Sequence, residues 1–209
     1  MTKQVKIYAG SDTYEKWQQI CERFSSNTAA FAVVVENYFN QIQEDTMNTA
    51  QQERAMNTER TQVEQWSDSD RRFIATQALD DAESGAHLLT LYDGDELVAV
   101  ASLEDDGTLM NMATKRRGWG DAILTEVARW AMDNNVEVSG LSTDQAIRFY
   151  AYHGFEIEGF PGENSGVPIW WSEQNMSAFL AGGEAREKMQ AAARAEFDEF
   201  VEEYELEVY

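Results

Sequence analysis

Two acidic turns that end in glycine constrain the fold of this chain more than any other feature. Asp93-Gly94 and Asp105-Asp106-Gly107 interrupt residues 87–114, which otherwise consist of short apolar segments. An Asp-Gly pair between two such segments favours a tight hairpin, because the central residues of that turn need a positive φ. The sequence therefore predicts three strands joined by short turns, an arrangement that makes this part of the sheet antiparallel.

The third of these strands leads into a glycine loop and a helix. We expect a strand over 109–114, a loop over 115–120 and a helix over 121–133, whose apolar residues recur on one face. Another helix should precede the strands, from Asp68 or Asp70 to Asp81. Beyond the loop we expect strands over 136–142, 155–160 and 167–171, a loop over 161–166, and a short helix over 145–154 capped by Thr143 or Asp144. The predicted fold class is α/β (α+β), with a mixed, mostly antiparallel central sheet flanked by helices.

Two outer segments flank this core. Residues 1–66 predict a short strand over 3–8, a helix that ends at Phe24, and a helical insertion over 28–66. Residues 181–209 predict an acidic C-terminal helix or tail, with nine carboxylates against three bases from Glu184 onward. We therefore divide the chain into 1–66, a core over 67–180, and 181–209.

The C-terminal helix carries an apolar stripe at helical spacing, made of Phe197, Phe200, Val201 and Tyr204. An acidic helix is usually a solvated face, but a purely solvated helix needs no such stripe. This helix is therefore a candidate surface for a protein partner.

Charge and composition exclude several classes of protein. The 209 residues contain 16 Lys and Arg against 38 Asp and Glu, a formal net charge of −22. That balance argues against direct nucleic-acid binding, which needs basic surface, but leaves open an acidic mimic of nucleic acid. One cysteine and two histidines argue against a disulfide framework or a metal site. Without a long apolar run we expect no membrane segment or signal peptide, and hence a soluble protein of a cytoplasmic, reducing compartment.

The glycine loop carries the clearest chemical signal. Lys115, Arg116 and Arg117 are the densest basic cluster of the chain, and Gly118 and Gly120 follow at the mouth of a predicted helix. Free backbone N–H groups at a helix N-terminus favour an anion, and glycine lets the backbone approach it closely. The loop therefore predicts a phosphate or pyrophosphate site, although a loop of this kind also occurs without a ligand. Its spacing fits neither the P-loop nor the Rossmann motif.

Together with the hairpins, two motifs resemble the GCN5-related N-acetyltransferase (GNAT) family. The family's acetyl-coenzyme A loop, Arg/Gln-x-x-Gly-x-Gly/Ala, corresponds to residues 115–120, KRRGWG. Its later segment, an Ala-aliphatic-x-aromatic-Tyr stretch before Gly-Phe, corresponds to AIRFY at 146–150 and to Gly154-Phe155. The resemblance covers about 70–172 and, more weakly, 3–24. Lys115 departs from the usual Arg or Gln, and Thr114 from a common Pro.

The resemblance implies an acetyl-CoA site with a defined set of residues. The strand before the loop would diverge from its neighbour, so that the backbone of Met112 and Thr114 faces the pantetheine arm. The pyrophosphate would be surrounded by the loop residues Lys115 and Arg116 and by the backbone N–H groups of Arg117, Gly118, Trp119, Gly120 and Asp121. Tyr150 would protonate the departing thiolate, a backbone N–H near Met112 would polarise the acetyl carbonyl, and the amine would attack directly.

Two functions remain open at this point. The first is an acetyl-CoA-dependent N-acetyltransferase that acts on a cationic primary amine, either a small molecule or a lysine-rich protein, drawn in by the negative surface. No general base stands out, since Glu104 at a strand end is more typical of a solvated turn carboxylate. The second is a non-catalytic interaction or assembly protein on the same fold, for example a phage virion component or an acidic nucleic-acid mimic.

Overall fold

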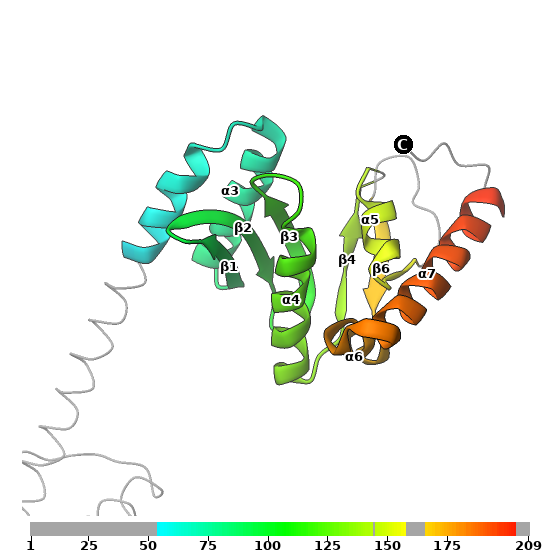
Figure 1. Cartoon of the computed structure of the whole chain (residues 1–209). Helices are drawn as coiled ribbons and strands as arrows, with labels where there is room; N and C mark the ends of the chain where they lie inside the picture. Colours follow the sequence, from blue (N-terminus) through cyan, green and yellow to red (C-terminus); the bar gives the residue numbers. More distant parts are fainter. Residues whose placement is uncertain (1–53, 144, 158–165, 204–209) are drawn as a thin grey trace, which may run out of the picture. The chain divides into compact units, whose positions relative to one another are not determined.

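The computed structural model describes residues 54–143, 145–157 and 166–203 (Figure 1). The predicted strand over 3–8, the helix that ends at Phe24 and most of the 28–66 insertion lie outside the described residues, as do Asp144, residues 158–165 and Tyr204. The chain divides into two compact units, Met1–Ala55 and Met56–Tyr209. The sheet and the helices that pack on it belong to the second unit.

A six-stranded sheet forms the centre of this unit. Its strands follow the order β1-β2-β3-β4-β6-β5. The β3–β4 pair is parallel, and every other described pair is antiparallel. The strands are β1 (His87–Asp93), β2 (Glu96–Leu103), β3 (Thr108–Thr114), β4 (Val138–Ser142), β5 (Glu156–Ile157) and β6 (Val167–Trp171). This confirms the predicted fold class, a mixed and mostly antiparallel sheet flanked by helices.

Helices cover both faces of the sheet. On one face lie α3 (Ser69–Glu83) and the helical segment 54–64; the other face carries α4 (Gly120–Asn134), α5 (Ile147–Tyr152), α6 (Glu173–Ala181) and α7 (Gly183–Glu203). The alternation of β2 explains this layering, because Ala99 and Ala101 pack with α4 whereas Val100, which lies between them, packs with α3. β2 is therefore buried on both faces.

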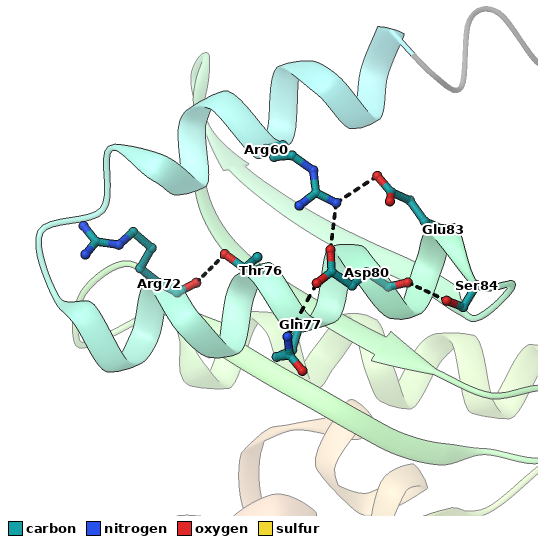
Figure 2. A network of polar contacts seen from close by, with 7 residues as sticks. All are labelled: Arg60, Arg72, Thr76, Gln77, Asp80, Glu83 and Ser84. Atoms are coloured by element: carbon teal, nitrogen blue, oxygen red, sulfur yellow. Dashed lines mark hydrogen bonds and ion pairs between the residues drawn. The ribbon is translucent and has the colours of Figure 1, made fainter.

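Arg60 links the helical segment 54–64 to α3 by two ion pairs. A single Nη2 of Arg60 donates to Asp80 Oδ1 and to Glu83 Oε1, each at 2.8 Å (Figure 2). Trp66, which follows this segment, is fully buried against the α3 side of the sheet. As predicted, Asp68 caps α3, accepting from the N–H groups of Asp70 and Arg71.

Two predicted starts, those of α5 and β4, differ from the structure for local reasons. α5 begins at Ile147 after an Ala146 N-cap without a side-chain bond, because the Thr143 carbonyl rather than its side chain accepts from these first N–H groups. The strand expected from 136 begins at Val138, because Val136 donates to Ala131 and so closes the C-terminal turn of α4. Of the strand expected over 155–160, Glu156–Ile157 is a strand, and residues 158–160 lie outside the described part of the chain.

The helix α6 was not predicted, although its start has a local signal. Ser172 accepts a hydrogen bond from Asn175 N–H and caps the helix, and Glu173 follows in the first turn. Ser at the N-cap with an acidic residue next is a recognised start signal. The helix connects β6 to α7, so that it places the C-terminal helix beside α5.

Part of the apolar stripe on α7 packs inside this chain. Phe197 is 4% exposed and contacts a cluster with Ile147, Ala151 and Val167, while Val201 packs against the same cluster. The idea that this stripe marks a partner surface is therefore wrong for Phe197, because α5 and β6 already cover it. The exposed face of α7 remains acidic.

Candidate functional site

The parallel pair β3–β4 diverges soon after it begins. Pairing is confined to Thr108 with Ser139 and Leu109 with Gly140, after which no register partner joins the two strands (Figure 1). β3 nevertheless continues to Thr114. One edge of β3 is therefore left without a neighbouring strand along most of its length.

A β-bulge lies at the point where this divergence starts. Leu103 of β2 pairs with Leu109, and Ser102 pairs with Asn111, so that Met110 has no partner on β2. A bulge bends its strand and increases the local twist. It accounts for the departure of β3 from β4 immediately after Leu109.

The open edge presents the backbone of the two residues that the family resemblance indicates. Lys115 N–H donates to Val98 O at 2.8 Å, so residue 115 faces β2. Since the bonding direction alternates along an antiparallel strand, Met112 and Thr114 face the opposite edge. The Thr114 carbonyl accepts from Arg71 Nη1 at 3.4 Å, whereas no strand pairs with Met112 on this side. Backbone groups of this kind suit an extended ligand that can bond like a strand.

The three cations of the loop have different surroundings. Lys115 Nζ pairs with Glu96 Oε1 at 2.7 Å, and Arg116 pairs with Asp93 Oδ2 at 3.3 Å. These carboxylates belong to the β1–β2 hairpin. Arg117 is exposed and, among the described residues, makes no ion pair. Of the predicted basic cluster, Arg117 is therefore the cation most available to a ligand.

The N-terminus of α4, called its mouth below, has backbone N–H groups without acceptors. Trp119 is the N-cap without a side-chain bond, and the first intrahelical bond runs from Ile123 N–H to Trp119 O. The N–H groups of Gly120, Asp121 and Ala122 accordingly have no acceptor within the described part of the chain. The helices α3 and α6, by contrast, carry side-chain caps. An anion at this position would supply the missing acceptor.

The two loop glycines serve different purposes. Gly118 has a φ of +101°, and a Cβ there would meet no atom within 4 Å, so the backbone is open to approach. A Cβ on Gly120 would lie 2.7 Å from Phe149 Cε2. The absence of a side chain at Gly120 therefore allows close packing of α4 against α5, and its backbone N–H remains free for a ligand.

Asp121 is tied to two other helices. His153 Nε2 lies 2.7 Å from its Oδ1, and Arg186 Nη2 of α7 donates to its Oδ2. Burial acts to raise the pKa of Asp121, but the hydrogen bond and charge of His153 and the charge of Arg186 outweigh it, so the pKa lies below its ordinary value. The negative charge beside the α4 mouth is therefore largely compensated.

His153 also closes the end of α5. Its Nδ1 lies 2.6 Å from the Phe149 carbonyl, so the ring contacts a carbonyl of the last turn of α5. The contact with Asp121 joins the mouth of α4 to the end of α5. The sequence did not single out Arg186, because an arginine in an acidic helix is normally expected on the solvated face.

Tyr150 lies in the core beside the diverging strands. It shares a packed cluster with Leu109 and Ile123, and Met112 and Trp119 pack against the same cluster. The side chain is 8% exposed, and burial raises the pKa of its phenol to about 12. Tyr150 therefore belongs to the same apolar cluster as Met112 and Trp119.

The hydroxyl of Tyr150 makes no hydrogen bond within the described residues, although the side chain is almost fully buried. The fully buried side-chain atoms without a partner are the indole nitrogens of Trp66 and Trp171, and the Tyr150 hydroxyl is not among them. A protonated hydroxyl without a partner can donate a proton to a ligand that reaches it.

An acidic hollow of about 480 Å³ lies on the α3 side, at the β3 bulge. Met110 lines it together with the carboxylates of Asp81, Glu104, Asp105 and Asp106. Glu104 is exposed at this position. Asp81 is fixed by bonds from Ser102 Oγ at 2.7 Å and Asn111 Nδ2 at 2.8 Å.

Two kinds of site are not found in the part of the chain that the structure describes. No group of three or more His, Cys, Asp or Glu side chains there is arranged to hold a metal ion. Among the same residues, no helix combines the length and the apolar character needed to cross a bilayer.

No protein-family model matches the sequence, and no curated protein matches it. The structure is similar to GNAT acetyltransferases and GNAT-fold toxins over about half of the chain. A putative GNAT acetyltransferase from Desulfovibrio desulfuricans has a TM-score of 0.42 and 19% identity, covering 56% of this chain and 90% of that one. An acetyltransferase from Bacillus subtilis, solved with CoA, has a TM-score of 0.38 and 18% identity, with coverages of 46% and 82%. A mutant of the toxin AtaT, bound to the C-terminus of the antitoxin AtaR, has a TM-score of 0.43 and 13% identity, with coverages of 58% and 90%. Similarity at this level carries no conclusion about substrate or partner.

Proposed function

We propose that the chain is an acetyl-CoA-dependent N-acetyltransferase that acts on a primary amine. This proposal rests on one observation: the edge of β3 that has no neighbouring strand and the N-terminus of α4 that has no side-chain cap follow each other along the chain. The open edge of β3 leads along the chain through the glycine loop to the uncapped mouth of α4. A ligand with an extended amide arm and a diphosphate matches both surfaces.

The residues present fit coenzyme A, which when bound would supply an activated acetyl thioester. The backbone of Met112 and Thr114 would bond its amide arm, as a neighbouring strand would. The N–H groups from Arg117 to Asp121 would hold the diphosphate, with the Arg117 side chain as the free cation of the loop. Gly118 leaves the space for that approach.

Tyr150 would act as the general acid toward the departing sulfur. Its pKa of about 12 keeps the hydroxyl protonated throughout the neutral range. The hydroxyl has no competing partner within the described residues and is not fully buried. A backbone N–H near Met112 would stabilise negative charge on the acetyl oxygen.

The proposed acceptor is a cationic amine, either a small molecule or a lysine-rich protein. The hollow at the β3 bulge presents four carboxylates, from Asp81, Glu104, Asp105 and Asp106. These groups and the net charge of −22 attract positive molecules and raise their local concentration. Glu104 is a candidate base for the amine, since it is exposed at the rim of this hollow.

Calorimetry with acetyl-CoA tests the coenzyme part of the proposal. We expect saturable binding by the full chain, and strong weakening in Gly118→Glu, which places a carboxylate where the diphosphate would lie. The matched control is Gly94→Glu, because Gly94 also has a positive φ with open space around it but lies in the β1–β2 turn. Absence of binding at millimolar acetyl-CoA, with the protein folded by circular dichroism, would overturn the proposal.

Turnover with a panel of amines tests the catalytic part. We expect Tyr150→Phe to reduce kcat by a factor of about 10² or more while leaving acetyl-CoA affinity nearly unchanged. Tyr92→Phe is the matched control, since the Tyr92 hydroxyl also has a pKa raised to about 12 but lies in the β1–β2 hairpin. Equal effects of the two substitutions would contradict the role of Tyr150.

A non-catalytic interaction protein on this fold is the second candidate function. The observation that favours it is the ion pairing of Lys115 and Arg116 with carboxylates of the β1–β2 hairpin, which leaves the loop with Arg117 alone. A stoichiometric partner recovered equally by the native chain, Gly118→Glu and Tyr150→Phe, in the absence of acetyl-CoA binding, would establish this function instead.

A further inference from the structure

A hollow of about 730 Å³ lies between α5 and α7, beside the mouth of α4. Arg148 and Tyr152 line it from α5, and Arg186 and Arg194 line it from α7. Its carboxylates are those of Asp121 and Glu187. Three arginines at one hollow are unusual in a chain in which acidic residues outnumber basic ones by more than two to one.

The three arginines are not equivalent. Arg186 is bonded to Asp121, and its guanidinium lies 3.9 Å from the centre of the Phe179 ring. Arg148 and Arg194 form no ion pair within the described residues. Arg186 is therefore occupied in holding α7 to α4, whereas Arg148 and Arg194 are available to a ligand.

The two available guanidinium groups converge on one aromatic ring. The carbon Cζ of Arg148 lies 5.3 Å, and that of Arg194 4.9 Å, from the centre of Tyr152. Their charges are thus no more than about 10 Å apart, which is the screening length at 0.1 M salt. The Arg148 Nε also donates to the Tyr152 hydroxyl at 3.1 Å, so this side chain is held in place. Two like charges within this length repel, and an anion that contacts both would relieve that repulsion.

The geometry points to a phosphomonoester as the ligand group of this hollow. Such a group carries close to two negative charges at neutral pH and three strong acceptor oxygens, which matches two guanidinium forks. The hollow also exceeds the space that one phosphate needs, so the ligand carries its phosphate on a larger body. Since Arg194 belongs to α7, outside the stretch that resembles the family, the C-terminal helix completes this site.

Two sources of the phosphomonoester are consistent with the structure. One is the 3′-phosphate of coenzyme A, in which case the inference rests on the proposed function and assigns α7 a part in binding the acetyl donor. The other is a separate phosphorylated molecule that binds beside the donor. In both cases the phosphate would bind to Arg148 and Arg194, and the experiment below distinguishes the two sources.

Calorimetry with four probes tests the inference on the full chain. The probes are coenzyme A, dephospho-coenzyme A, which lacks the 3′-phosphate, adenosine 3′,5′-bisphosphate and inorganic phosphate. The variants are Arg148→Gln and Arg194→Gln. Lys188→Gln is the control, because it removes an exposed cation from the same helix away from this hollow.

If the 3′-phosphate is the ligand group, each arginine variant weakens coenzyme A binding about tenfold or more and leaves dephospho-coenzyme A unchanged. If a separate molecule is the source, the variants weaken the bisphosphate or inorganic phosphate and leave coenzyme A unchanged. Equal losses for coenzyme A and its dephospho form, or losses equal to those of Lys188→Gln, overturn the inference while the proposed function stands. Arginine-dependent binding of the bisphosphate without any binding of coenzyme A would instead remove the proposed function and keep the inference.

Discussion

At the scale of single residues, the surroundings of Tyr150 set its chemistry. Burial alone raises the pKa of its hydroxyl to about 12, without a contribution from a neighbouring charge. A phenol with this pKa is a proton donor at every pH at which the protein is normally handled, so we expect no loss of kcat near pH 10 from this group. Activity as a function of pH between 7 and 10.5, in the native chain, tests this expectation for the catalytic role.

The same shift makes the stability of the fold depend on alkaline pH. Because the folded pKa of Tyr150 is raised above that of the unfolded chain, its contribution is intact below about pH 10 and is lost as the pH rises toward 12. A shift of about two units corresponds to roughly 2–3 kcal/mol. We expect the free energy of unfolding in urea to fall less steeply between pH 9 and 11.5 in Tyr150→Phe than in the native chain. Parallel curves for the two proteins would contradict this assignment.

Asp121 should show the opposite dependence. Its folded pKa lies below the unfolded value, so the stability it provides is present above about pH 4 and is lost as the pH falls through the folded pKa. The group is more than half exposed, so we expect Asp121→Asn to lower stability at pH 7 by only about 1 kcal/mol. Urea midpoints of the two proteins should converge near pH 3, and a difference that persists there would mean that the loss has another cause.

At the scale of elements, the junction of α4 and α5 depends on one missing side chain. A Cβ at Gly120 would lie 2.7 Å from the Phe149 ring, closer than such contacts allow. We expect Gly120→Ala to destabilise the fold by about 1–3 kcal/mol, although alanine is the better helix former. The measurement is urea unfolding of this variant, of Phe149→Ala and of the double variant. The double variant should lose less than the two single losses added together, and simple additivity would contradict the contact.

The elements that could be predicted from sequence are those specified by local residues. Both turns of the β1–β2–β3 meander were predicted because Asp-Gly fixes them through backbone conformation alone, and Gly94 and Gly107 have φ values of +63° and +91°. The Asp68 cap of α3 is equally local. By contrast, Thr143 was a plausible cap, but the chain makes a turn before the helix starts. The Thr143 carbonyl, and not its side chain, therefore accepts from the N–H groups of Ala146 and Ile147.

The candidate site was predictable only in part, because its remaining contacts join distant segments. The glycine loop and Tyr150 are visible as motifs. The bonds of Asp121 to His153 and Arg186 span 32 and 65 residues, and no local pattern indicates them. Gly120 was expected to let the backbone approach a ligand; the structure adds a second reason for glycine there, the ring of Phe149, which lies too far along the chain for a local pattern to indicate. The arginine pair on Tyr152 depends on α7 packing against α5, which the composition of an acidic helix does not suggest.

At the scale of the whole molecule, a net charge of −22 acts on the two proposed substrates in opposite ways. A cationic amine is attracted from a distance, while acetyl-CoA, which is itself an anion, is repelled until it reaches local cations such as Arg117. Salt screens both effects, because the screening length falls from about 30 Å at 0.01 M to about 8 Å at 0.15 M. The sign of the salt effect therefore distinguishes the two substrates.

We expect KM for a polycationic amine to rise severalfold between 10 and 150 mM salt, while KM for acetyl-CoA stays level or falls. Steady-state kinetics with each substrate varied in turn measures both slopes. Removing two carboxylates at the acidic hollow, with Glu104→Gln and Asp105→Asn together, should flatten the slope for the amine. Removing two from the exposed face of α7, with Glu196→Gln and Glu199→Gln, makes the same change in net charge at a distance from that hollow. If both double variants flatten the slope equally, the overall charge governs the approach of the amine; if neither does, electrostatic attraction does not select the acceptor.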